Sequence, residues 1–226
     1  MEAPAAESRI ARPVVRRLGR VEYREAWQAM KAFTARRDAS TPDELWLVEH
    51  PPVFTLGQAG RREHLLAANG IEVVQSHRGG QITYHGPGQI VVYTLIDLRR
   101  LGIFVRELVY RIEQSVIQTL DAFGLDGRRV AGAPGIYVPV GLATPSGDPR
   151  FAGLAKIAAL GIKISRGCAY HGVALNVAMD LAPFGRIDPC GYPGLATVDL
   201  ATLGVQAGWP SVADRLLERL SSHLSP

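Results

Sequence analysis

A glycine-rich segment, Arg78 to Gln89, constrains this chain more than any other part of the sequence. It reads Arg-Gly-Gly-Gln-Ile-Thr-Tyr-His-Gly-Pro-Gly-Gln, with four glycines and one proline. This composition excludes a regular helix or a long strand, but it allows sharp turns and close approach to a ligand, because glycine has no Cβ. The segment leads into the apolar run Ile90 to Ile96, which is typical of a buried strand. A shaped loop on a rigid strand favours a binding site over a structural turn.

Bulk composition excludes several classes of protein. The 226 residues predict a single domain at 13–226 after a frayed tail at 1–12. No apolar run approaches the ~20 residues that span a bilayer, and no signal-peptide core is present, so we expect a cytoplasmic protein without a membrane partner. Two cysteines cannot form a disulfide scaffold. Zinc-ligand spacings and a phosphate loop are absent, so we expect neither metal nor cofactor.

The positive charge of the chain bears on its partners. The formal net charge is +4, and the arginines that carry most of it are scattered along the sequence. No basic motif with interleaved aromatic residues occurs. The signal for nucleic acid is therefore weak, and an acidic protein partner fits the charge as well.

Hydrophobic patterning predicts an α+β fold (of the α/β two-layer type), with a mixed, mostly antiparallel sheet packed with helices. The clearest helix is 104–123, where apolar residues recur every three or four positions and Gly124 follows as a C-cap. Two more helices are expected at 21–37 and 211–224, and a surface hairpin insertion at 141–151. Strands are expected at 13–18, 43–48, 53–56, 90–96, 135–140, 155–164 and 173–177.

The two cysteines differ in their surroundings. Cys190 stands between proline and glycine, without apolar neighbours at strand or helix spacing, so we expect an exposed turn with an accessible thiol. Such a thiol can act as a nucleophile in its thiolate form. Cys168 competes for this role, but it lies at the mouth of a strand-like segment, so the pattern favours Cys190.

A cysteine nucleophile needs a base or a cation nearby, because a free thiol with a pKa near 8.5 is mostly protonated at neutral pH. The candidates are His85, His171 and Lys156. Lys156 is unexpected, because it interrupts an apolar strand in which Leu154 and Ala158 would share its face. Burial lowers the pKa of a lysine, which can then serve as a base or as the ammonium partner of a thiolate.

Four motifs in this order resemble one family. They are Arg78-Gly-Gly-Gln-Ile-Thr-Tyr-His-Gly-Pro-Gly-Gln89, Lys156-Ile-Ala-Ala-Leu-Gly161, Gly167-Cys-Ala-Tyr-His-Gly-Val-Ala-Leu-Asn176 and Pro189-Cys-Gly191. Together they are similar to the octanoyl-acyl-carrier-protein:protein N-octanoyltransferases, the lipoate-biosynthesis protein B family. The resemblance covers residues 43–203, and the N-terminal tail and the 141–151 insertion lie outside its motifs.

The resemblance implies a fold similar to the catalytic domain of biotin and lipoate protein ligases. It also implies octanoyl transfer from octanoyl-acyl carrier protein to a lysine of lipoyl domains, in 2-oxoacid dehydrogenase E2 subunits and glycine cleavage H protein, by a monomer. Cys190 would be the acyl-thioester nucleophile and Lys156 the residue that promotes its ionisation. The acyl site would be lined by Arg78, Gly79, Gly80, Gln81, Ile82, Thr83, Tyr84, His85, Ala159, Leu160, Gly161, Gly172, Val173 and Ala174.

The residues themselves agree with this role. Acyl transfer through one sulfur divides a hard step into two easier ones. A thiol nucleophile suits a thioester donor, because one thioester is exchanged for another of similar energy. We expect Gly161 and Gly172 to offer unhindered N–H groups to an oxyanion, and the nearby small residues to leave room for a C8 chain. Two alternatives remain: an ATP-dependent lipoate or biotin ligase of the same fold, and a non-catalytic module that binds a carrier protein.

Overall fold

The structure, a computed structural model, describes residues 12–141 and 146–225. The tail predicted at 1–12 therefore lies outside the described residues except for Arg12, as does part of the insertion predicted at 141–151. Within the described ranges the chain forms ten strands and four α-helices, together with four short 3-10 turns. In chain order these are β1 (Val14–Arg20), α1 (Tyr23–Arg36), β2 (Glu44–Glu49), β3 (Val53–Leu56), η1 (Arg62–His64), β4 (Glu72–Gln75), β5 (Ile82–His85), β6 (Gln89–Asp97), α2 (Leu98–Leu101), α3 (Val105–Asp121), β7 (Arg128–Val130), β8 (Ala133–Pro139), η2 (Pro149–Phe151), β9 (Leu154–Ser165), β10 (Cys168–Asn176), η3 (Ala182–Arg186), η4 (Pro189–Gly191) and α4 (Trp209–His223).

A seven-stranded sheet forms the centre of the fold. Its strand order is β1-β2-β6-β10-β9-β8-β7, and only the β1–β2 pair is parallel. Strands β6 and β10 lie in the middle and are buried along their whole length. The observed sheet confirms the predicted mixed, mostly antiparallel class.

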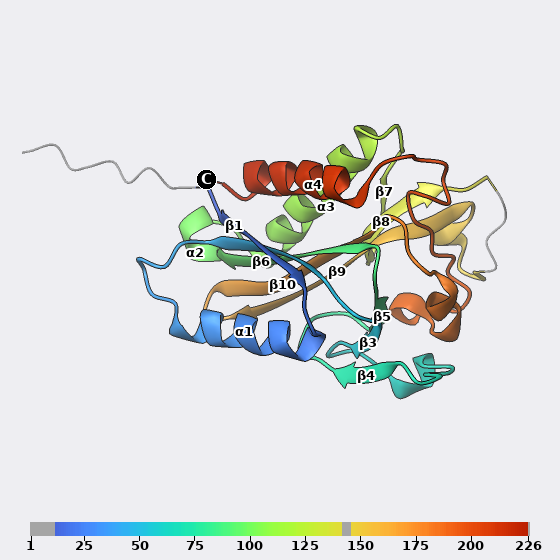
Figure 1. Cartoon of the computed structure of the whole chain (residues 1–226), viewed down its shortest axis with the longest axis horizontal. Helices are drawn as coiled ribbons and strands as arrows, with labels where there is room; N and C mark the ends of the chain where they lie inside the picture. The colour runs from blue at the N-terminus through green and yellow to red at the C-terminus, as the bar shows by residue number, and fades with distance from the viewer. Residues whose placement is uncertain (1–11, 142–145, 226) are drawn as a thin grey trace, which may run out of the picture.

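Helices cover both faces of this sheet (Figure 1). Helix α1 packs on one face, because Ala26, Met30 and Phe33 recur at intervals of three and four residues and join side chains from β2, β6 and β10. Helices α3 and α4 cover the other face, where the largest hydrophobic cluster lies. No helix in the described ranges is both long and apolar enough to cross a membrane.

A second sheet, of order β4-β3-β5, lies beside α1 on the same side of the large sheet (Figure 1). Strand β3 runs parallel to β4 and antiparallel to β5. Strand β5 lies inside the glycine-rich segment, which is therefore a loop, a four-residue strand and a tight turn into β6. The small sheet thus holds this segment over the middle of the large sheet.

Most predicted elements have their expected type, with ends displaced by no more than two residues. The main exception is β10, which begins at Cys168 instead of the predicted residue 173. The sequence Cys-Ala-Tyr-His-Gly resembles a loop, and His171 indeed has a positive φ of 64°. The segment is a strand nevertheless, because β6 and β9 pair with it from both sides.

Candidate active site

Cys190 lies in a tight turn, η4, which follows β10 and η3 in the chain. Its backbone has a φ of 57°, a left-handed conformation that is uncommon for residues other than glycine, and Gly191 follows with a φ of 76°. The predicted turn is present, but the thiol is half-buried and not exposed as predicted. The strained backbone fixes the direction of the side chain, as at many functional sites.

Lys156 meets Cys190 from the large sheet. The Nζ atom of Lys156 lies 3.0 Å from the Sγ atom of Cys190, and the lysine is only 3% exposed. Nζ also donates to the carbonyl oxygen of Pro134, at 3.1 Å, and to the hydroxyl of Tyr137, at 3.2 Å. An ammonium has three N–H donors, and the three acceptors use all of them.

These contacts determine the charge of Lys156. Burial alone would lower the pKa of the amine, as the sequence suggested, but the negative forms of Cys190 and Tyr137 outweigh burial and raise the pKa above its usual value. Lys156 is therefore an ammonium in the resting site, and the expectation of a lowered pKa is wrong for that state. The arrangement is a lysine cation beside a cysteine sulfur.

Gly135 makes room for this lysine. A Cβ on residue 135 would lie 2.9 Å from Nζ of Lys156 and 2.6 Å from the carbonyl oxygen of Ala158. Its φ of 127° is also unfavourable for other residues. The Pro134-Gly135 pair therefore brings a carbonyl oxygen to the ammonium without blocking it.

An inner cavity runs from Cys190 between the glycine-rich segment and the large sheet. It contains about 490 Å³ of space free of atoms, its open mouth included. One wall is made of small residues, because Ala159 pairs with Ala174, and Gly161 with Gly172, across β9 and β10. The structure brings together twelve of the predicted lining residues here: Arg78, Gly80, Gln81, Ile82, Thr83, His85, Ala159, Leu160, Gly161, Gly172, Val173 and Ala174.

Two predicted lining residues lie elsewhere. The ring of Tyr84 points into the cluster under the small sheet, with its centroid 5.5 Å from those of both Phe54 and Phe184. Gly79 does not line the inner cavity, and its N–H donates to the carbonyl oxygen of Ile162, at 3.1 Å. Side chains alternate along a strand, so in β5 the side chain of Tyr84 points away from the cavity that Thr83 and His85 line.

An outer cavity reaches Cys190 from another side. Gly79, Val105, Pro134, Ile162 and Tyr192 contribute to its walls, and it contains about 860 Å³ of space including its opening. Cys190 lines both cavities. The sulfur therefore stands where an internal, mostly apolar space meets a second opening to solvent.

Arg78 is buried in the wall of the inner cavity, at 8% exposure. Its guanidinium donates to the hydroxyl and the carbonyl oxygen of Thr55 and to the carbonyl oxygen of Gly79. Burial lowers the pKa of Arg78 from its usual value. Arginine nevertheless stays protonated at neutral pH, so this wall carries a fixed positive charge.

The two candidate histidines are neutral in the folded protein. Burial, with His50 and Arg78 nearby, lowers the pKa of His85 to about 3. Burial and the charge of Arg78 lower the pKa of His171 to about 3 as well. Neither imidazole can supply a cation to Cys190 at neutral pH, whereas Lys156 contacts the sulfur directly.

Gly172 does not have the expected role in an oxyanion site. It pairs with Tyr93 on one side and Gly161 on the other, so its backbone belongs to the sheet ladder. A Cβ at this position would overlap the carbonyl oxygen of Val92. Gly172 is therefore needed for strand packing between β10 and β6.

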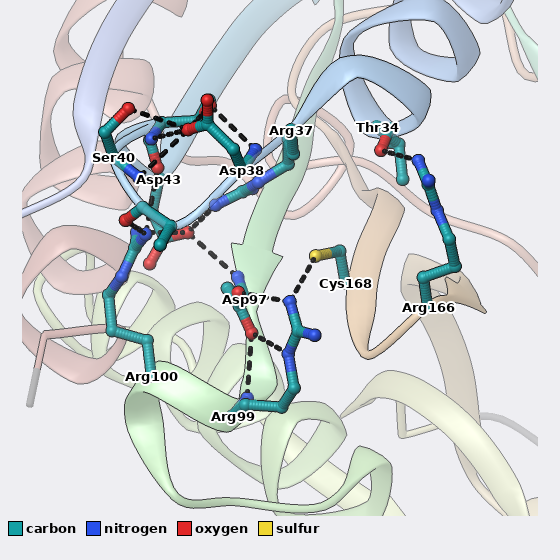
Figure 2. A network of polar contacts seen from close by, with 12 residues as sticks. Thr34, Arg37, Asp38, Ser40, Asp43, Asp97, Arg99, Arg100, Arg166 and Cys168 are labelled. Carbon is teal, nitrogen blue, oxygen red and sulfur yellow. Dashed lines mark hydrogen bonds and ion pairs between the residues drawn. The ribbon is translucent and has the colours of Figure 1, made fainter.

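Cys168 lies far from this site, at the other end of β9. It pairs with Ser165, nine residues along the strand from Lys156, which corresponds to roughly 30 Å. It is buried, and burial together with Asp97 raises the pKa of its thiol. Figure 2 shows the sulfur beside Arg99, whose Nη2 atom is 3.8 Å away.

Sequence reasoning missed several residues of the site. Tyr23, Val91 and Tyr93 line the inner cavity, as does His171, which was considered only as a base. Tyr137 holds Lys156. Its hydroxyl in the middle of an otherwise apolar predicted strand was a usable signal, whereas Val91 had none. In residues 12–141 and 146–225, no three His, Cys, Asp or Glu side chains are placed to hold a metal.

Comparison with known proteins identifies the family. Residues 22–221 match the model of the lipoyl protein ligase A/B catalytic domain. The chain belongs to this family. It is 58% identical over 226 residues to the octanoyltransferase of Albidiferax ferrireducens, covering 93% of this chain and 96% of that protein. It is 61% identical over 219 residues to the octanoyltransferase of Methylibium petroleiphilum, covering 93% of this chain and 98% of that protein.

Solved structures agree on the fold. Lipoate-protein ligase A with bound ATP superposes with a TM-score of 0.71 at 17% identity, covering 95% of this chain and 86% of that one. The biotin protein ligase of Aquifex aeolicus gives 0.56 at 13% identity, covering 93% and 70%. The predicted ligase-like fold and the predicted enzyme class, an octanoyl-transferring acyltransferase of lipoate biosynthesis, are confirmed.

Proposed function

We propose that this family member moves an octanoyl group from octanoyl-acyl carrier protein to a lysine of a lipoyl domain, through a thioester on Cys190. The observation that supports this most is the 3.0 Å contact between Nζ of Lys156 and Sγ of Cys190, where the two cavities meet. An ammonium that contacts a half-buried sulfur favours the thiolate, the nucleophilic form.

In the first half-reaction, the Cys190 thiolate attacks the carbonyl carbon of the octanoyl thioester and forms a C–S bond. The tetrahedral intermediate collapses, the C–S bond to the carrier breaks, and the departing thiolate takes a proton from the Lys156 ammonium. Cys190 then carries the acyl group and Lys156 is a neutral amine. Burial favours the neutral form once the sulfur has lost its charge, because an unpaired buried ammonium is costly.

In the second half-reaction, the acceptor lysine attacks the thioester as a neutral amine, after its ammonium proton has gone to solvent, and the neutral Lys156 accepts the proton that this nitrogen loses as the amide forms. The C–N bond forms, the C–S bond to Cys190 breaks, and the sulfur leaves as a thiolate. Lys156 is again an ammonium beside that thiolate. One residue thus serves as acid and then as base, and no proton is gained or lost at the site over the cycle.

The two cavities suit the two parts of the substrate. The inner cavity, walled by Ala159, Gly161 and Ala174, suits an unbranched alkyl chain. The outer cavity offers the sulfur a route for the thioester arm and then for the acceptor lysine.

Further features support the choice of partners. A structure similar in fold, at 16% identity and a TM-score of 0.71, is titled a bi-partite lipoate protein ligase and its E2 lipoyl domain from Thermoplasma acidophilum. We extend that kind of acceptor, lipoyl domains of 2-oxoacid dehydrogenase E2 subunits and glycine cleavage H protein, to this chain. The net charge of +4 suits acidic partners. We place the reaction in the cytoplasm and in a monomer.

An ATP-free transfer assay tests the proposal. The chain is mixed with octanoyl-acyl carrier protein and an apo lipoyl domain, and the mass of the domain is followed with and without ATP. We expect octanoylation without ATP, and none with Cys190→Ser. A strict requirement for ATP and free octanoate would indicate a ligase instead. Binding of the carrier without any transfer would indicate a non-catalytic module.

A further inference from the structure

Arg78 is a buried cation without a carboxylate partner. Among the described residues no ion pair involves it, and its hydrogen-bond acceptors are neutral groups of Thr55 and Gly79. Burying a charge without a counter-charge is costly, and folded proteins rarely do so without a functional reason. Lys156 is the second such cation, since its acceptors are a carbonyl oxygen, a hydroxyl and the Cys190 sulfur.

The same fold treats another buried arginine differently. Arg37 is 3% exposed and forms an ion pair with Asp43, which is equally buried. At Arg37 the chain thus supplies a buried carboxylate to balance the buried charge. The lack of one at Arg78 points to an anion that the site itself supplies, either the Cys190 thiolate or a reaction intermediate.

The position of the Arg78 guanidinium is fixed by glycines around it. A Cβ on Gly57 would lie 2.9 Å from Nη1, and a Cβ on Gly161 would lie 3.2 Å from Cδ of the same side chain. Glycine at positions 57 and 161 therefore leaves the space that the Arg78 side chain occupies. Arg78 lines the inner cavity together with Cys190, so its charge acts across a partly enclosed space, where charges interact more strongly than in bulk water.

We propose that Arg78 is the fixed cation of the site, which stabilises negative charge on the Cys190 sulfur and on the tetrahedral intermediates while Lys156 carries the moving proton. This inference rests on the proposed function. When Lys156 is a neutral amine, after the first half-reaction, Arg78 is the positive charge that remains in the cavity wall. A guanidinium suits this role because it does not give up its proton at neutral pH.

The pKa values of two histidines in the cavity wall agree with a positive electrostatic field from Arg78. The charge of Arg78 contributes to the lowered pKa of His85 and of His171, after burial. Both imidazoles are thus neutral and do not compete with Arg78 for an anion. The other titratable groups around Cys190 are His64 of η1, whose carbonyl oxygen accepts from the N–H of Asp188, and the tyrosines of the two cavities. Asp188 forms no ion pair with Arg78 or Lys156 in the described chain.

The test is the pH profile of Cys190 alkylation by iodoacetamide, which needs no acyl donor. Cys168→Ser serves as the background, so that one thiol is followed. Arg78→Gln removes the charge, and we expect the profile to move to higher pH by about one unit. Arg78→Lys keeps a positive charge, so its alkylation profile should lie close to that of the chain with Arg78. Arg100→Gln, at the other end of the sheet, is the control and should leave the profile unchanged.

Thr55→Val is the second variant, because it removes one acceptor of Arg78 with little change in volume. It should move the profile in the same direction by a smaller amount. An unmoved profile in folded Arg78→Gln would overturn the inference, as would Arg78→Lys behaving like Arg78→Gln. If Arg78→Gln does not fold, an unmoved profile in Thr55→Val overturns it. Failure of the proposed function would appear separately, as a wild-type chain that alkylates normally but accepts no octanoyl group.

Discussion

At the scale of single residues, the site depends on a lysine whose charge is set by its neighbours. Lys156 is buried, yet its pKa is raised, because a sulfur and a phenol surround the ammonium. Without its anion the same lysine would have a lower pKa, because burial would then dominate. A change of charge on Cys190 is thus coupled to a proton on Lys156.

Removal of Lys156 should therefore make Cys190 less reactive at neutral pH. For Lys156→Ala, we expect the pH profile of iodoacetamide alkylation to move upward by one unit or more, about what loss of a contacting cation implies. His171→Ala is the control and should change the profile little, because that imidazole is already neutral. An unmoved profile in Lys156→Ala, with a displaced one in His85→Ala, would assign the role to the histidine.

The buried histidines predict a loss of stability in weak acid. His85 and His171 have folded-state pKa values of about 3, against about 6.5 in an unfolded chain. Between these values the unfolded state binds more protons, so stability falls as pH falls through 6.5 towards 3. From pH 7 to pH 5 each histidine should lower the free energy of unfolding by about 2 kcal/mol.

Urea unfolding at the two pH values measures this effect. His171→Asn should remove about 2 kcal/mol of the decrease between pH 7 and pH 5, because Asn does not titrate and tolerates a positive φ. An equal decrease in His171→Asn and in the wild-type chain would show that this histidine is protonated in the folded state.

At the scale of elements, the cross-strand pairs of small residues on β9 and β10 shape the inner cavity. Two of these residues, Gly172 and Ala159, differ in what a larger side chain would contact. A Cβ at Gly172 would meet the backbone of β6, so a substitution there reports on folding. Ala159 already has a Cβ in the cavity wall, so a larger side chain there meets the substrate.

Ala159→Leu should shorten the acceptable acyl chain. We expect kcat/KM for octanoyl transfer to fall about tenfold or more, since overpacking costs about 1–3 kcal/mol, while butanoyl transfer falls much less. Ala158→Val is the neighbouring control. Ala158 packs in the cluster under α3 and α4, and its substitution should affect both chain lengths equally. Equal losses in Ala159→Leu would place the alkyl chain elsewhere.

The elements also show what the sequence could predict. The periodicity of residues 104–123 predicts α3 well, and Gly-Pro-Gly correctly marks the turn into β6. The first half of β10 could not be predicted, because Tyr170, His171 and Gly172 form a strand only when β6 and β9 pair with them. Local sequence does not carry that information.

The site, like the secondary structure, could be predicted only in part. Cys190 and Lys156 stood out because each contradicts its local pattern, one in a turn and the other in an apolar strand. Their contact connects residues 34 positions apart, and only the fold determines it. Tyr84 was misplaced because a motif gives residue order, whereas the alternation of β5 decides which side chains face the cavity.

At the scale of the whole molecule, Cys190 and the main buried ion-pair network lie at opposite ends of the large sheet. Figure 2 shows that network, in which Asp43 forms ion pairs with Arg37 and Arg100 and accepts a hydrogen bond from the backbone N–H of Asp97. It connects α1, β2, β6 and α2. The separation predicts that stability and reactivity can be changed independently.

Asp43→Asn tests this separation. Breaking a buried ion pair costs about 3–5 kcal/mol, so we expect Tm to fall by about 10 °C. Alkylation of Cys190 should keep its pH profile. Arg17→Gln, which removes an exposed ion pair with Asp214, is the control and should change Tm by less than about 2 °C. A displaced alkylation profile in folded Asp43→Asn would show that the two ends of the sheet are coupled.

The central claim, that Cys190 carries the acyl group, is tested most directly by intact mass spectrometry after incubation with octanoyl-acyl carrier protein. The account predicts one added octanoyl group on the wild-type chain and on Cys168→Ser, and none on Cys190→Ser. An adduct that maps to Cys168, or an octanoyl group that remains on Cys190→Ser, would contradict it.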